Sequence, residues 1–414
     1  MDNRNRINNK KKIDGKKRKK KKRISASVDV KILYSIVLLL AIGLVMIFSA
    51  SAYHALYEFN DPYYFLKKQI VWVILGISIM CIIMLVDYRF WKKFSAAGYV
   101  ITLLPLVYVL STEPIMGATR WIEIGPLSFQ PSELAKYMMV FFLAYAIEKY
   151  RKVIRKSIIV PIILIMIPGI YAALILAENN LSITAVVMIV GVIMIFVAGI
   201  KMKHLIPIGT VGLIGGFYFM VSEEYRLKRF LTFMDPWSDM TGDGYQIIHS
   251  FYALGSGGLL GQGLGASKQK LLYIPEPQND FIFSIIGEEF GLIGCIVIIA
   301  VFAFLIFHGI KVASKVRDRY AKLLAVGIIS VIAIQCLINV AVVTGSMPVT
   351  GVPLPFISYG GTSLVFNMAA MGVLLNISKQ ANREALMLER KKAVREKAKL
   401  EQSQFDGSFI NKRY

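Results

Sequence analysis

The chain contains 414 residues, of which 56% are apolar and only 18% are charged, and this composition excludes an ordinary soluble protein. Its formal net charge of +22 at pH 7 is concentrated at the ends, because residues 1–23 carry +11 and residues 379–414 carry +5. The first basic run has neither aromatic side chains nor apolar periodicity, so no nucleic-acid partner is expected. The composition predicts an all-α, polytopic membrane protein.

Residues 1–30 are predicted to form a disordered basic tail, and residues 381–414 form a second basic tail. Lys-rich segments beside a membrane are attracted to anionic lipid by about 1 kcal/mol per charge. We therefore expect both tails to contact anionic lipid. The first apolar run has no small-residue cleavage site after it, so it is predicted to be a membrane span and not a removable signal peptide.

Ten apolar segments are long enough to cross a bilayer, whose hydrocarbon core requires about 20 helical residues. In chain order they are residues 32–52, 69–86, 95–111, 134–148, 157–177, 181–200, 205–222, 281–307, 321–344 and 361–378. Together they define a predicted transmembrane domain over residues 31–380. An even number of spans places both termini on the same side.

Basic residues in the short loops set the predicted orientation. The loops on the side of the tails contain 15 Lys and Arg, and the opposite loops contain 8 over a longer stretch. Both tails are therefore predicted to be cytoplasmic. The largest outside loop, about residues 223–280, lies between the seventh and eighth spans. It is rich in Trp, Tyr, Phe and Gly, so we expect it to be ordered and functional.

The sequence offers no strong cofactor motif. The three cysteines stand singly in apolar runs, and the four histidines form no HExxH-like pair, so zinc chemistry is not expected. The glycines of residues 255–265 lack the GK[ST] ending of a nucleotide phosphate loop. No cofactor is certain, and a divalent cation such as Mg²⁺ or Mn²⁺ remains open.

Ionisable groups within or beside membrane spans are costly, and each one suggests a functional site. The segment GATRWIEIGPLSFQPSELAK contains Arg120, Glu133 and Lys136. Glu133 and Lys136 share one face of a helix at spacing i,i+3. Two interpretations stay open for this pair: an internal ion pair that orients the helix, or direct contact with a substrate.

The segment IPEPQNDFIFSIIGEEFG begins the eighth span. Extrapolated at 100° per residue, Asp280, Ser284, Gly287 and Gly291 follow one line, with Glu288 to one side. This stripe predicts a face toward the bundle interior or a wet cleft, with Asp280 at its outer mouth as a candidate general base. The alternative is that Asp280 only complements the helix dipole.

Two further groups of polar residues complete the candidate site. Cations of the large loop suit a lipid phosphate, or are ordinary snorkelling residues: Arg226, Lys228, Arg229, Lys268 and Lys270. The segment TGSMPVTGVPLPFISYGGTS, with Ser358 and Tyr359, is rich in Pro and Gly. Non-helical backbone at membrane depth lines protein or a cavity, so this segment is predicted to form a re-entrant wall beside the same cleft.

Over roughly residues 30–380 these motifs, in this order, resemble the SEDS family (shape, elongation, division and sporulation). The resemblance implies a peptidoglycan glycosyltransferase of the bacterial cell membrane. It would join lipid II units into undecaprenyl-linked glycan at the outer face and release undecaprenyl pyrophosphate. The implied partners are a class B penicillin-binding protein transpeptidase and other divisome proteins, with enrichment at the division septum.

The resemblance also implies roles for individual residues. The aspartate matching Asp280 is required for polymerisation in that family, and the family's Glu–Lys pair matches Glu133 and Lys136. Where many members have a Pro-Asp pair, this chain has Asn179 and Asn180. Where many have a histidine two residues before the aspartate, this chain has Gln278.

Three alternatives to a division polymerase remain. The elongation or sporulation paralogue would perform the same chemistry. A lipid II flippase would require ionisable groups through the full membrane thickness, whereas the candidates here cluster in the outer half. A division scaffold would leave Asp280 unexplained.

Overall fold

The computed structural model describes residues 27–112, 120–125, 127–154, 159–222, 224–242 and 244–410. The chain divides into two units, Asp29–Ser378 and the two terminal segments. The elements in chain order are α2 (Val30–Phe59), α3 (Tyr64–Leu85), α4 (Tyr88–Val109), β1 (Ile122–Ile124), β2 (Leu127–Phe129), α5 (Pro131–Lys149), α6 (Ile159–Ala177), α7 (Leu181–Val197), α8 (Met202–Val221), α9 (Glu224–Met234), η1 (Pro236–Asp239), α10 (Tyr245–Gly257), α11 (Ile282–Lys315), α12 (Arg319–Val343) and α13 (Gly361–Ile410).

Each of the ten predicted spans overlaps one helix of this set, but most of the helices extend beyond the predicted limits, and the first runs from Val30 to Phe59. Among the described residues, six helices are long and apolar enough to cross a membrane: α2, α3, α6, α11, α12 and α13. The chain is therefore a multi-pass membrane protein. The number of ten spans and the cytoplasmic placement of both termini stay predictions.

Several helices begin at a side chain that caps their first amide groups. Asp29, Asp87 and Asp318 precede α2, α4 and α12, and each carboxylate accepts a hydrogen bond from the amide two residues later, at 3.1, 2.9 and 2.9 Å. Such caps satisfy backbone donors that have no partner within the helix. Pro131 begins α5, where its missing N–H costs nothing.

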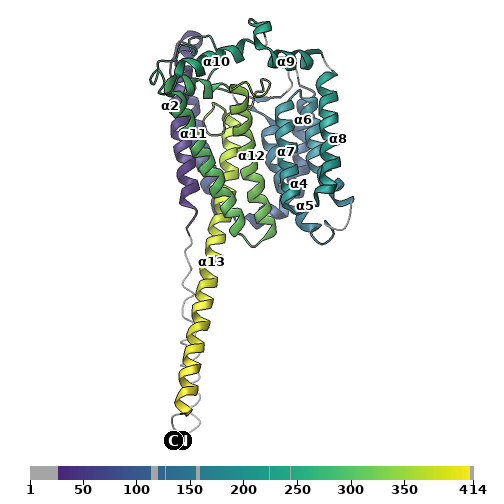
Figure 1. Ribbon diagram of the computed structural model, residues 1–414, viewed down its shortest axis with the longest axis vertical. Helices are drawn as coiled ribbons and strands as arrows, with labels where there is room; N and C mark the ends of the chain where they lie inside the picture. The colour runs from purple at the N-terminus through teal and green to yellow at the C-terminus, as the bar shows by residue number, and fades with distance from the viewer. Residues whose placement is uncertain are drawn as a thin grey trace. The chain divides into compact units, whose positions relative to one another are not determined.

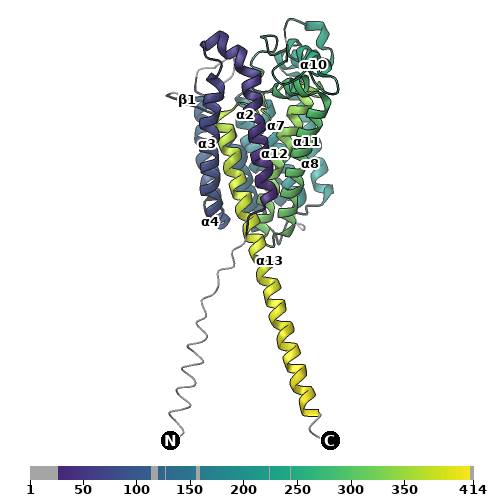
Figure 2. The same ribbon diagram turned by 90° about the vertical axis from the view of Figure 1, so that its left-hand side faces the viewer.

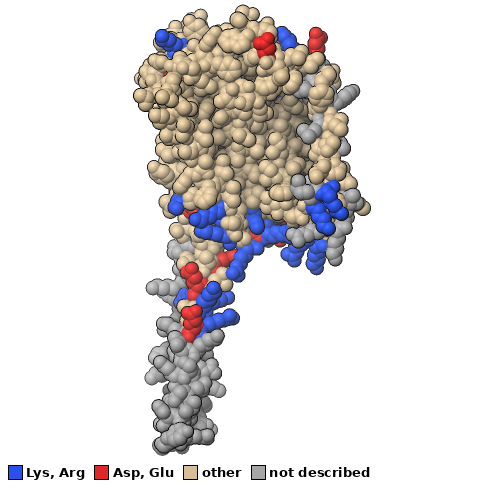
Figure 3. Space-filling model, viewed as in Figure 1, with Lys and Arg blue, Asp and Glu red and all other residues tan. Residues whose placement is uncertain are grey.

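The bundle is built from antiparallel neighbours, with α4 on α5, α6 on α7 and α11 on α12. Figure 2 shows α2, α3 and the start of α13 side by side. On the face visible in Figure 3, Lys and Arg side chains gather at the end of the bundle opposite α9 and α10. This distribution supports the predicted orientation, because basic residues are enriched in cytoplasmic loops.

The large loop contains regular structure that hydropathy did not predict. It folds into α9, the short 3₁₀ helix η1 and α10, and these lie across one end of the bundle (Figure 1). A short antiparallel hairpin of β1 and β2 lies between α4 and α5, and in it Ile122 pairs with Phe129. The large loop is therefore a folded cap that holds the residues following α10 in place.

The cap is joined to α11 through a break in that helix. At Gly291, φ is 66° and ψ is −165°, so the helical ladder is interrupted. The amides of residues 292 and 293 donate instead to the carbonyls of residues 258 and 259, at 2.9 and 3.2 Å. In return, the amides of residues 262 and 263 donate to the carbonyls of residues 288 and 289, at 2.9 and 3.0 Å. Residues 258–263, here called the wedge, thus replace the missing helical hydrogen bonds.

The wedge requires glycine where two backbones approach closely. A Cβ atom at Gly257 would lie 2.0 Å from the Gly287 carbonyl oxygen, and one at Gly261 would lie 2.2 Å from the Glu289 carbonyl oxygen. Gly261 also has a φ of +83°, which side chains disfavour. Gly257 and Gly261 of the Gly-rich motif therefore allow the backbone to pack against α11.

We predict that Gly257→Ala destabilises the protein, because its Cβ would overlap backbone that cannot move without displacing the wedge. Overpacking of this kind costs about 1–3 kcal/mol. Thermal unfolding of the purified protein measures the effect. Gly255→Ala is the matched control, because a Cβ there meets nothing within 4 Å on the same helix. Equal melting temperatures for the two variants would contradict the close packing.

Candidate active site

Asp280 lies in the segment between α10 and α11, two residues before α11 begins. Its backbone carbonyl accepts a hydrogen bond from the Asn339 side-chain amide of α12, at 2.7 Å. The same amide group donates to the Val352 carbonyl at 2.9 Å. Asn339 is 1% exposed, so a buried side chain of α12 holds together the two loops that flank Asp280.

The second of these loops, residues 344–360, is non-helical, as its prolines and glycines predict, and it is buried at residues 352 and 354–358. Its backbone packs against Gly43 of α2, where a Cβ would lie 2.6 Å from the Phe356 carbonyl oxygen. A Cβ at Gly351 would lie 4.0 Å from Asp280 Oδ2. The Tyr359 amide donates to the Gln278 carbonyl at 2.9 Å. This loop therefore forms one wall beside the Asp280 carboxylate.

The Asp280 carboxylate is partly buried, and within the described part of the chain it has no hydrogen-bond or ion-pair partner on another residue. Burial, with a smaller contribution from the charge of Glu276, raises the pKa of Asp280 to about 6. A carboxylate with a pKa near the working pH can accept a proton from a hydroxyl group. Asp280 has the environment expected of a general base.

The other polar residues predicted along α11 have internal partners. Ser284 is fully buried, and its hydroxyl donates to the Phe281 carbonyl at 2.6 Å. Glu288 accepts three hydrogen bonds from the segment after the wedge, with Ser267 Oγ at 2.5 Å, the Lys268 amide at 2.9 Å and the Gln269 amide at 3.3 Å. Because α11 begins after Asp280, the helical extrapolation that placed Asp280 on the same stripe does not apply.

The two glycines of that stripe face protein and not a wet cleft. A Cβ at Gly287 would lie 2.4 Å from the Leu254 side chain of α10, and one at Gly291 would lie 2.5 Å from the Gly261 amide nitrogen. The prediction that the stripe lies away from lipid therefore agrees with the packing. The two glycines of the stripe pack against the cap and the wedge.

The cations of the large loop fall into different environments. Lys270 is buried and forms an ion pair with Glu289 at 2.7 Å, with Ser49 of α2 at 3.1 Å. Lys228 pairs with Asp239 at 3.2 Å, and Lys268 is exposed. Arg229 lines a pocket, and Arg226 lies on α9 with its side chain outside the described part of the structure. The Lys270 ammonium group is therefore neutralised by an internal ion pair with Glu289.

Glu133 and Lys136 form a fully buried ion pair in the first turns of α5. Their Nζ and Oε2 atoms are 2.8 Å apart, and the two residues are 1% and 0% exposed. Next to them, the Tyr137 hydroxyl donates to Asn367 of α13 at 2.6 Å. The geometry shows the ion pair, and substrate contact stays a prediction.

Arg120, from the same motif, reaches the turn between α6 and α7. It donates to the carbonyls of Glu178, at 3.4 Å, and Asn179. Asn180 caps α7 by accepting the Ile183 amide at 3.3 Å. Asn179 and Asn180, which stand where many family members have Pro-Asp, therefore stabilise this turn.

The hydroxyl groups predicted in the 344–360 loop also have described contacts. Ser358 is 5% exposed and its Oγ accepts the Leu354 amide at 2.8 Å, so it closes a turn of the loop. The Tyr359 ring contacts Phe65 of α3 edge to face, with centroids 5.2 Å apart. Burial raises the pKa of Tyr359 to about 12, so its hydroxyl stays protonated at neutral pH.

Sequence reasoning missed the residues that position the site. Asn339 lies in an apolar run. A polar side chain is costly in a membrane span, so its presence there could have indicated a functional role. Glu289, the residue after Glu288, forms the buried ion pair with Lys270. Glu178 is fully buried with neither carboxylate oxygen hydrogen-bonded, and burial raises its pKa to about 8 while Arg120 opposes that shift.

Among the described residues, no group of three His, Cys, Asp or Glu side chains is arranged to hold a metal ion. The divalent cation that the sequence leaves open stays a prediction.

Comparison with known proteins places this geometry in a family. The FtsW/RodA/SpoVE family model, described as "Cell cycle protein", matches residues 30–383. The chain belongs to this family. The "Probable peptidoglycan glycosyltransferase FtsW" of Geobacter sp. (strain M18) is 41% identical over 84% of this chain and 96% of its own length. "Stage V sporulation protein E" of Bacillus subtilis (strain 168) is 43% identical over 85% and 97%.

Solved structures give the same assignment. The rod shape determining protein RodA of Thermus thermophilus has a TM-score of 0.64 and 25% identity, over 85% of this chain and 96% of its own. A chain described under "Structural coordination of polymerization and crosslinking by a peptidoglycan synthase complex" has a TM-score of 0.70 and 25% identity, over 86% and 98%. The predicted family and the predicted enzyme class, a peptidoglycan glycosyltransferase, are confirmed.

We predict that exchanging the charges, with Glu133→Lys and Lys136→Glu together, separates the two interpretations of the buried pair. Each single variant places two like charges side by side in this buried site and is expected to lower the yield of folded protein, because even the loss of one partner of a buried pair costs about 3–5 kcal/mol. If the pair only orients α5, the double variant regains folding and polymerisation. Regained folding with persistent loss of polymerisation would instead show contact with the substrate.

Proposed function

We propose that this protein polymerises lipid II at the outer face of the bacterial cell membrane. The observation that carries the proposal is the Asp280 carboxylate, which is partly buried beside the 344–360 loop, has no partner on another described residue and has a pKa of about 6. Asp280 lies between α10 and α11, and α10 lies across the end of the bundle opposite the gathered Lys and Arg side chains (Figures 1 and 3). Family membership supplies the substrate class.

In the proposed step Asp280 accepts the proton of the 4-hydroxyl group of one lipid II sugar. The freed oxygen electron pair forms a bond to the anomeric carbon of the undecaprenyl-pyrophosphate-linked chain. The bond from that carbon to the phosphate oxygen breaks, and undecaprenyl pyrophosphate leaves with the electron pair. Positive charge near the departing group favours this step, and Arg229, Lys228 and Lys268 are the described candidates.

The partner we propose is a class B penicillin-binding protein transpeptidase. The support is the likeness to a chain of a solved complex that is described as coordinating polymerisation and crosslinking. We further propose a role in division, at the septum with other divisome proteins. The FtsW relatives support this role, and co-purification of the partner tests it against the sporulation and elongation roles.

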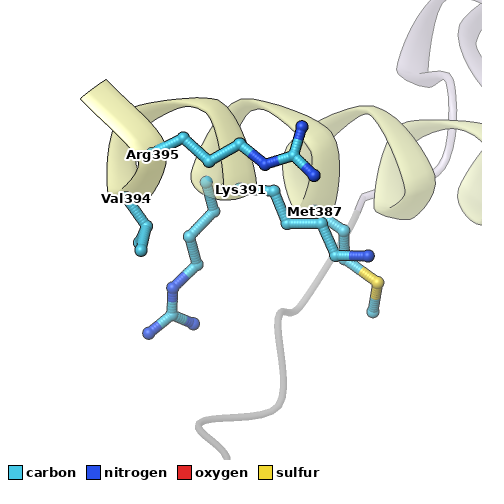
Figure 4. Close-up of a pocket in the computed structure, with 5 residues that line it drawn as sticks. Met387, Lys391, Val394 and Arg395 are labelled. Carbon is cyan, nitrogen blue, oxygen red and sulfur yellow. The ribbon is translucent and has the colours of Figure 1, made fainter. Parts of the chain in front are cut away.

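The C-terminal part of α13 is proposed to bind anionic lipid. Met387, Lys391 and Val394 follow helical spacing, and with Arg390 and Arg395 they line a shallow pocket (Figure 4). A helix surface that mixes cations with exposed apolar side chains suits the interface of an anionic membrane.

We predict that Asp280→Asn lowers the rate of lipid II polymerisation by at least about a hundredfold, because loss of a general base typically costs 10²–10⁴. The measurement is glycan-strand formation by the purified protein with its partner. Asp61→Asn is the control, because Asp61 is an aspartate of the α2–α3 loop whose described ion pair is with Lys67.

Equal partner binding by both variants would show that the loss is chemical. Normal glycan strands from Asp280→Asn would refute the role of Asp280 as the base. Transfer of lipid II across liposome membranes without any polymer would refute the proposed polymerase activity and would support a flippase.

A further inference from the structure

We infer that a pocket beside Asp280 is the subsite that binds a sugar ring of the lipid-linked substrate. The inference rests on the proposed function and deepens it. The pocket lies between the cap and the two loops that flank the carboxylate. It is lined by Arg229, Thr241, Gly242, Tyr245, Gln246, Pro275 and Val349.

The position of the pocket follows from the loops that form it. Pro275 belongs to the segment that leads to Asp280, and Val349 belongs to the 344–360 loop. Asn339 joins these same two loops at the Asp280 and Val352 carbonyls. A ring held in the pocket would therefore lie on loops whose relative position is fixed next to the base.

The polar side of the pocket is suited to sugar substituents. Gln246 is half-buried, and its side-chain amide has no hydrogen-bond partner within the described residues. The Thr241 hydroxyl is likewise without one. An amide group and a hydroxyl group both donate and accept hydrogen bonds, which matches the hydroxyl and acetamido groups of an N-acetylhexosamine. These groups are available to a ligand at no cost to the fold.

The apolar side of the pocket is held rigidly. The Tyr245 ring packs on the His249 ring, with centroids 4.2 Å apart. His249 is fixed in turn by a hydrogen bond to Gln269 at 2.7 Å and by stacking on Tyr273 at 5.5 Å. With Pro275, the Tyr245 ring provides a firm apolar surface for the carbon face of a sugar. Pockets that join such a surface to a few polar groups are typical of small-molecule sites.

The charge of the pocket favours a sugar over the pyrophosphate. Arg229 is the one charged residue of the described lining, and the other six residues are neutral. A pyrophosphate calls for several cations or backbone donors. We therefore assign the neutral sugar to this pocket and leave the pyrophosphate to the neighbouring cations.

The test compares Gln246→Leu and Tyr245→Leu with the control Tyr252→Leu. Tyr252 lies two turns from Tyr245 on α10 and also contacts His249, at 5.7 Å, but it does not line the pocket. We expect both pocket variants to raise the KM for lipid II by about tenfold, the typical effect of losing a well-placed contact, and to change kcat less. The control should keep the wild-type KM.

A second measurement separates this inference from the proposed function. Binding of radiolabelled lipid II is measured in the Asp280→Asn background, where polymerisation is blocked. Binding should persist in Asp280→Asn alone and weaken when Gln246→Leu or Thr241→Val is added. If the wild-type complex polymerises lipid II while these variants keep its KM and its binding, the sugar subsite is refuted and the polymerase stands. If the wild-type complex forms no polymer, the proposed function fails by itself.

Discussion

The two hydrogen bonds donated by the Asn339 amide are the constraint on which the site depends. They connect α12 to the carbonyls of Asp280 and Val352, which lie in segments about 70 residues apart in the chain. A buried amide that loses its acceptors costs about 1–3 kcal/mol, so both loops are held to the position that satisfies it. The carboxylate of Asp280 is thereby fixed against a wall of buried backbone and kept partly out of water.

The broken helix α11 provides the second support. A continuous helix would satisfy its own backbone and leave the cap unattached. The wedge takes over the free groups of α11 around Gly291, and the Lys270–Glu289 pair with Ser49 ties the following segment to α2. The cap, α2 and α11 are therefore one structure, and the cap can carry a pocket at a fixed distance from Asp280.

Much of the fold could be predicted because membrane spans are long apolar segments that hydropathy identifies. The approximate positions of the ten helices and the buried pair Glu133–Lys136 follow from the cost of polar groups in lipid, and the catalytic role of Asp280 stays a prediction. The contacts of the cap could not be predicted, because they are formed by backbone groups brought together by the tertiary fold. Lys270 illustrates this, since its sequence context is that of an exposed loop while the fold buries it on Glu289.

The helical extrapolation from Asp280 failed for a similar reason. A period of 100° per residue applies only inside a helix, and α11 begins at Ile282. Asn339 and Gln246 were missed because one polar residue in a span or loop does not show which backbone or ligand it will meet. Their roles depend on loops that approach one another from distant parts of the sequence.

The pH dependence of kcat/KM for lipid II polymerisation tests the central claim most directly, because this quantity reports the ionisation of the free enzyme. Since burial raises the pKa of Asp280 to about 6 and the deprotonated form is the base, the rate should rise by about tenfold per pH unit below 6 and level off above it. A rate that is flat, or that falls as the pH rises from 5 to 7, would contradict the account of Asp280 as the general base.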